Sequence, residues 1–182
     1  MSQGSEPLPA YNPEIREEGL NLAEDALREH ILAALQGVID RRFEGAMKDF
    51  PMEAINMPPP HVPYTPWGLL EHLRVSQLDI LDYITNPNYV ARNHPVEYWP
   101  PEGTQADAAM WNQSLEQFRA DRKTMEALVA DPETDLLAPM AHTPGHTVLR
   151  EALLIVSHLS YHLGEFGILR EVMQTWPADH YK

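Results

Sequence analysis

The residues best suited to chemistry in this 182-residue chain are two histidines, His158 and His162, within the stretch 155–168. Residues four apart lie one above the other on the same face of an α-helix, so two imidazoles at this spacing can bind one metal ion. Glu165 follows on the same face. A polar cluster beside an apolar stripe is costly to bury unless something satisfies it, and a metal ion would do so. Histidines hydrogen-bonded inside a core are the alternative.

A third metal ligand must come from another helix, and His72 is the best candidate because it lies one turn into a second predicted helix. Leu159, not glutamate, follows the first histidine of the pair, which excludes the helix motif of zinc peptidases. Three neutral imidazoles plus water are typical of a catalytic site, since one coordination position stays open. Zinc or nickel is the expected ion, with manganese or iron as alternatives.

Two carboxylates are candidates for a catalytic role beside these histidines. Glu165 shares the face of the histidine pair, and Asp79 lies on a polar line with His72 at helical spacing. Either carboxylate could orient a ligand histidine or act on bound water, and a surface or helix-capping role is the alternative. The aromatic residues expected to wall a pocket at the metal are Trp67, Tyr83 and Trp99.

Apolar periodicity predicts four helices and no strands. They run from Gly19 to about Phe50, from Pro66 to about Thr85, from Thr104 to about Ala130 and from Thr147 to about Gln174. The fold class is therefore all-α, a four-helix bundle. The connections after the first and second helices are long, and one or both are expected to cross the length of the bundle. Residues 1–17 are predicted to be a flexible tail and residues 18–182 a single domain.

Composition excludes several classes of function. The formal net charge is −14, which opposes binding to nucleic acid and to an anionic membrane surface. The chain has no cysteine, which excludes disulfides, thiolate metal sites and a cysteine nucleophile. No apolar run approaches the roughly 20 residues of a membrane span, and the first residues do not resemble a signal peptide. A cytoplasmic location is expected.

Two stretches resemble the DinB-like superfamily. They are residues 65–74, with Trp67 and His72 at a fixed spacing, and residues 149–170, which carry the histidine pair followed by glycine. The segment 97–100, Glu-Tyr-Trp-Pro, also matches several members. The resemblance covers residues 20–175 and implies a four-helix bundle with a crossover, often dimeric, in which three histidines bind a divalent metal. Glu165 stands where members usually have glutamine.

The resemblance implies a metal-dependent enzyme of the thiol-dependent S-transferase or hydrolase type. In such relatives the metal activates a low-molecular-weight thiol, for example bacillithiol or mycothiol. The expected partners are a second copy of the chain and a small-molecule substrate or thiol. The alternatives are a non-catalytic or stress-related dimer that the metal only stabilises, and a helical dimer without metal. A solvent-accessible pocket at the histidines would favour the enzyme, and a closed coordination shell would favour the structural role.

Overall fold

A computed structural model describes residues 13–180 of the chain, with side chains from residue 22 onward. The longer helical elements are α1 (Pro13–Leu32), the π-helix η1 (Ala33–Ile39), α2 (Asp40–Met47), α3 (Pro66–Thr85), α4 (Ala108–Ala130) and α5 (Val148–Met173). Two short 3₁₀ turns, η2 (Met52–Ala54) and η3 (Val96–Tyr98), lie in the connections. Residues 13–180 contain no β-strand, so the predicted all-α class is confirmed.

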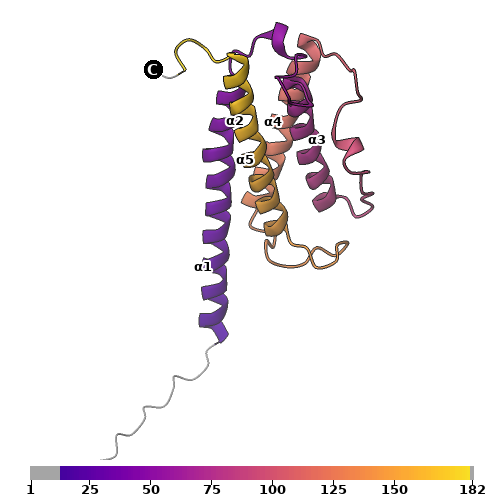
Figure 1. Cartoon of the computed structure of the whole chain (residues 1–182). Helices are drawn as coiled ribbons and strands as arrows, with labels where there is room; N and C mark the ends of the chain where they lie inside the picture. Colours follow the sequence, from indigo (N-terminus) through magenta and orange to yellow (C-terminus); the bar gives the residue numbers. More distant parts are fainter. Residues whose placement is uncertain (1–12, 181–182) are drawn as a thin grey trace, which may run out of the picture.

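The first helix of the bundle is one long rod in which α1, η1 and α2 follow one another without a break (Figure 1). It begins at Pro13, before the expected Gly19, and ends at Met47. Five residues of the expected tail, 13–17, are therefore helical, and residues 1–12 lie outside the described part. The π-helical turn in its middle was not predicted, because apolar spacing does not distinguish i→i+5 from i→i+4 hydrogen bonds over seven residues.

The order of the helices in space confirms one crossover (Figure 1). The first rod runs up to residues 48–65, which connect to α3 at the same end of the bundle. Both α3 and α4 run down, so residues 86–107 must return along the whole length of the bundle, and α5 then runs up. Because α3 and α4 are parallel, this return needs a long connection, whereas antiparallel neighbours need only a few residues.

Side-chain caps set the starts of the helices that carry the histidines. Thr65 caps α3 as predicted, because its side-chain oxygen accepts the N–H of Gly68 at 3.0 Å. Thr147 caps α5 in the same way. Helix α4 begins later than the predicted Thr104, because its cap is Asp107, whose side-chain oxygen accepts the N–H of Met110. The hydroxyl of Thr104 instead donates to a carbonyl within its own turn.

Helix α3 is the most enclosed of the helices, because it packs against α4 and α5 and the returning connection covers it further. Its buried side chains include the polar His72, Ser76 and Asp79 as well as apolar ones. Burial of polar groups at this depth is costly unless they are paired. His72 and Asp79 are both paired, so their partners indicate how this part of the bundle is organised.

Helix α5 has the length and apolar composition of a membrane span, the one such helix in the described part of the chain. It also supplies core residues that pack inside the bundle, among them Ile155, Leu159 and Phe166. A central core helix of a globular domain meets the same criteria of length and composition. We therefore take α5 as a bundle helix.

Candidate metal centre

Three histidines from two helices meet in the middle of the bundle, as the sequence predicted. His72 comes from α3, and His158 and His162 come from successive turns of α5. One ring nitrogen from each lies within 4.8 Å of the others, a group that could hold a metal ion. His72 is buried, whereas both histidines of α5 are partly exposed. The group is therefore open to solvent on the side of α5.

The ring of His72 is held from two directions by the connection between α3 and α4. Its Nδ1 lies 3.0 Å from the backbone carbonyl of Tyr98. The indole of Trp99 stacks on the imidazole, with ring centroids 4.1 Å apart and an angle of 6° between the planes. A carbonyl only accepts hydrogen bonds, so Nδ1 carries the proton and Nε2 of the neutral ring carries a lone pair.

The ring of His162 is held by Glu165, one turn further along α5. Nδ1 of His162 lies 2.6 Å from the carboxylate. An ionised carboxylate also only accepts, which again leaves the lone pair on Nε2. Burial and the Glu165 carboxylate both raise the pKa of the Tyr64 hydroxyl, and a hydrogen bond to the same carboxylate raises the pKa of Tyr161. Two phenols and one imidazole therefore share this acceptor.

These hydrogen bonds point two lone pairs at each other. Nε2 of His72 and Nε2 of His162 are 3.2 Å apart, a distance at which a shared proton or a metal ion can lie between two lone pairs. Burial, and then the neighbouring imidazoles, lower the pKa of His158 to about 4, and burial lowers the pKa of His72. The donor set of imidazole nitrogens fits a divalent metal ion.

Of the two predicted carboxylates, only Glu165 lies at the histidines. Asp79 accepts a hydrogen bond from the hydroxyl of Tyr98 at 2.6 Å and lies 3.3 Å from the guanidinium of Arg92. The hydroxyl of Tyr89 is a further donor at 3.2 Å. Asp79 thus fastens the connection whose Tyr98 carbonyl holds His72. Asp79 therefore affects the histidines only indirectly, through that connection.

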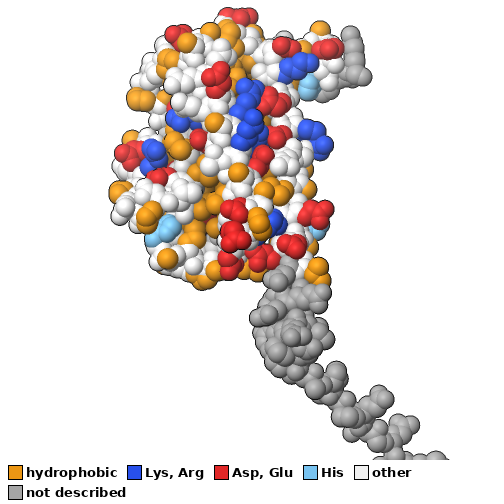
Figure 2. Space-filling model, turned by 180° about the vertical axis from the view of Figure 1, so that it is seen from behind, with side chains coloured by type: hydrophobic (Ala, Val, Ile, Leu, Met, Phe, Trp, Pro, Cys, Tyr) orange, Lys and Arg blue, Asp and Glu red, His pale blue; other side chains and the backbone are white. Residues whose placement is uncertain are grey.

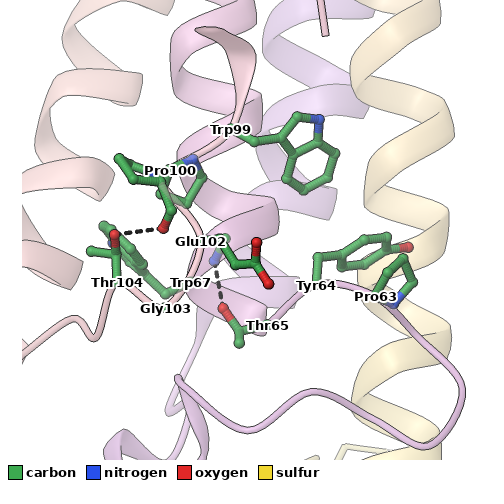
Figure 3. A pocket seen from close by; sticks show the side chains of 11 residues that line it. Pro63, Tyr64, Thr65, Trp67, Trp99, Pro100, Glu102, Gly103 and Thr104 are labelled. Atoms are coloured by element: carbon green, nitrogen blue, oxygen red, sulfur yellow. Dashed lines mark hydrogen bonds between the residues drawn. The ribbon is translucent and has the colours of Figure 1, made fainter. Parts of the chain in front are cut away.

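The expected aromatic walls divide between two places. Trp67 and Trp99 line a cavity of about 540 Å³, which Figure 3 shows between the loop at Tyr64 and the turn after Trp99. None of the three histidines lines this cavity, and its link to them is the ring of Trp99, which stacks on His72. Tyr83 lies elsewhere, where its hydroxyl is 2.7 Å from Nδ1 of His146. His146 is thus paired outside the metal group.

Two features of the centre escaped sequence reasoning. The carbonyl of Tyr98 leaves no mark in residue types, because every residue has one. The stacking of Trp99 on His72 joins residues 27 positions apart across the crossover, at 4.1 Å. For the hydrogen bond that holds His162, the sequence did contain a signal, namely the carboxylate of Glu165 three residues after this predicted ligand.

A comparison with models of protein families shows to which family the chain belongs. Residues 34–166 match the model of the DinB superfamily. The chain belongs to the DinB superfamily. The matched range contains all three histidines and ends just after Glu165. Searches of curated proteins and of solved structures found no match.

Proposed function

We propose that this DinB-superfamily protein is a divalent-metal-dependent enzyme in which His72, His158 and His162 hold the ion and leave a coordination position for substrate. The proposal is carried by the 3.2 Å separation of two Nε2 atoms whose rings each donate their other N–H to an acceptor. Catalytic sites built on three imidazoles keep a position open, and the partial exposure of the α5 histidines supports access to it.

The reaction we propose is thiol-dependent group transfer or hydrolysis. A divalent ion bound here would act as a Lewis acid that lowers the pKa of a thiol or of water. Glu165 keeps His162 in the tautomer that presents Nε2, and Tyr98 does the same for His72. Trp99 covers one face of His72 and limits water there. Since the chain lacks cysteine, the sulfur would come from a low-molecular-weight thiol.

A cytoplasmic location is part of the same proposal, because a small thiol cofactor is kept reduced there. Nucleic acid and membrane are not proposed as partners. On the face that Figure 2 shows, basic side chains lie beside acidic ones and do not form a separate patch, which phosphate binding would need. The net charge of −14 supports the same view.

We also propose that the protein forms a homodimer in which the partner packs on exposed apolar residues of α5 and borders the open side of the histidine group. Leu154, Tyr161, Ile168 and Val172 recur there at helical spacing and are 42–67% exposed. Large apolar side chains gathered on one helix face often mark an interface. Sedimentation of the purified chain tests this, and Ile168→Lys should dissociate the dimer while a monomeric parent would refute it.

Elemental analysis of protein purified without an affinity tag tests the metal proposal, because a nickel column can load such a site. We expect about one ion per chain in the parent, none in His158→Ala, and full content in the control His146→Ala. Loaded protein is then assayed with thiols and electrophiles. No metal after incubation with zinc, nickel, manganese and iron would refute the site. Metal that stabilises the chain without any activity would favour the structural alternative.

A further inference from the structure

The cavity beside the histidines has an acidic and aromatic lining. It lies between residues 63–68 and residues 99–104 and has a volume of about 540 Å³. Aromatic rings and prolines make up most of its wall, and Glu102 is the one charged residue that lines it. No lysine, arginine or histidine lines it. An anionic ligand would thus meet a carboxylate and no counter-charge.

The backbone places Glu102 at the tip of a tight turn that projects over the cavity (Figure 3). The N–H of Thr104 donates to the carbonyl of Pro101 at 3.1 Å. Gly103, at the third position of this turn, has a φ of 78°, which glycine adopts without the strain of a side chain. Figure 3 shows the Glu102 carboxylate turned toward Tyr64. Glu102 is exposed to solvent, and the turn holds its charge beside the aromatic wall.

The Glu102 carboxylate has neither a hydrogen bond nor an ion pair with any residue that the structure describes. The neighbouring hydroxyls are in use: Thr65 accepts the N–H of Gly68, and Thr104 donates to Pro101. Tyr64 is engaged with Glu165. The charge available to a ligand in the cavity is therefore a single negative one.

We propose that this cavity binds an organic cation, an amine or quaternary ammonium group, at the Glu102 carboxylate and against the aromatic wall of Tyr64, Trp67 and Trp99. Aromatic rings attract cations through their quadrupole, and a nearby carboxylate adds to this attraction. The net charge of −14 raises the local concentration of cations around the whole chain. Carboxylates and phosphates are disfavoured for the same reason.

Two wall residues connect the cavity to the histidine group. Trp99 stacks on His72, and Tyr64 contacts Glu165, which holds His162. Tyr64 and Trp99 also stack on one another, with centroids 5.3 Å apart. A ligand in the cavity therefore lies against the residues that support the proposed metal. The inference rests on the proposed function, because it names a cationic molecule as the substrate class of the proposed enzyme.

The test compares choline with its neutral isostere 3,3-dimethyl-1-butanol. Binding to the full chain is measured by calorimetry or by quenching of tryptophan fluorescence, since Trp67 and Trp99 line the cavity. We expect choline to bind about tenfold more tightly than the isostere, as a carboxylate and two rings acting together would give. Glu102→Gln should remove this preference, and Glu133→Gln, which removes an equal charge from an exposed loop position, should keep it.

Each measurement is made on metal-loaded and on chelator-treated protein, with the metal content determined separately. Equal binding of the two ligands by the parent, or a preference that survives in Glu102→Gln, overturns the inference. Protein that prefers choline but takes up no metal supports the cationic selectivity of the cavity and refutes the metal enzyme. Protein that holds metal without any preference overturns the cation site alone.

Discussion

Removing the carboxylate of Glu165 should weaken metal binding without touching a metal ligand. Its oxygen lies 2.6 Å from Nδ1 of His162 and fixes the tautomer that presents Nε2. The two side chains are 27% and 12% exposed, so water screens this contact only in part. A hydrogen bond to a charged group contributes about 1.5–3 kcal/mol, and partial exposure favours the lower half of that range.

A loss of about 1.5–2 kcal/mol corresponds to roughly a 10- to 30-fold lower affinity, at about 1.4 kcal/mol per factor of ten. Glu165→Ala should show the full effect, because His162 is then free to present either nitrogen. Glu165→Gln should show less, because its amide oxygen still accepts from Nδ1. The control Glu53→Gln removes an exposed charge elsewhere and should leave the affinity unchanged.

The assay is a competition titration of zinc or cobalt against a chromophoric chelator at constant pH. Folding of each variant is checked by circular dichroism. An affinity of Glu165→Ala equal to that of the parent would refute the reasoning, because His162 would then not need its carboxylate to present Nε2. A loss as large as that of His162→Ala would instead indicate that Glu165 binds the ion directly.

Two further predictions concern the stability of the chain. Asp79→Ala should lower the free energy of unfolding by about 1–3 kcal/mol in urea titrations, because the hydroxyl of Tyr98 loses its acceptor at 2.6 Å. The control Asp82→Ala should change the free energy of unfolding little. Equal stability of the two variants would show that Asp79 does not hold the connection in place. In metal-free protein, the pKa of His158 in the folded chain is about 4, below its value of about 6.5 in the unfolded chain. As the pH falls, the unfolded chain therefore binds a proton at His158 before the folded chain does. The free energy of unfolding should then fall by about 2 kcal/mol from pH 6.5 to pH 4. His158→Gln should flatten this slope and the exposed His30→Gln should not, and identical slopes in both variants would contradict the prediction.

Local rules were sufficient to predict most of the helices. The start of α3 at Pro66 followed from the cap at Thr65, and the ends of α3 and α4 followed from Asn86-Pro87 and Asp131-Pro132. The prediction of the first helix was less accurate, because the periodicity near its start at Pro13 and at its π-helical turn is weak. The start of α4 was predicted too early, at Thr104, because both Thr104 and Asp107 are good capping residues.

The sequence by itself indicated which residues could hold a metal ion. Helical spacing put His158 and His162 on one face with Glu165, and His72 was chosen because it lies one turn into the second predicted helix. These inferences were possible because a helix fixes the relative positions of residues three and four apart. The absence of cysteine further excluded thiolate metal sites and a cysteine nucleophile.

Only the tertiary structure decided how these residues face one another. The crossover places Tyr98 and Trp99 against His72. Asp79 contacts this connection and does not contact the histidines. The tertiary structure also decides that the two Nε2 atoms meet at 3.2 Å and that Glu102 lines an aromatic cavity. These contacts join residues from separate helices and loops, and their distances depend on how the whole bundle packs, which no local spacing rule contains.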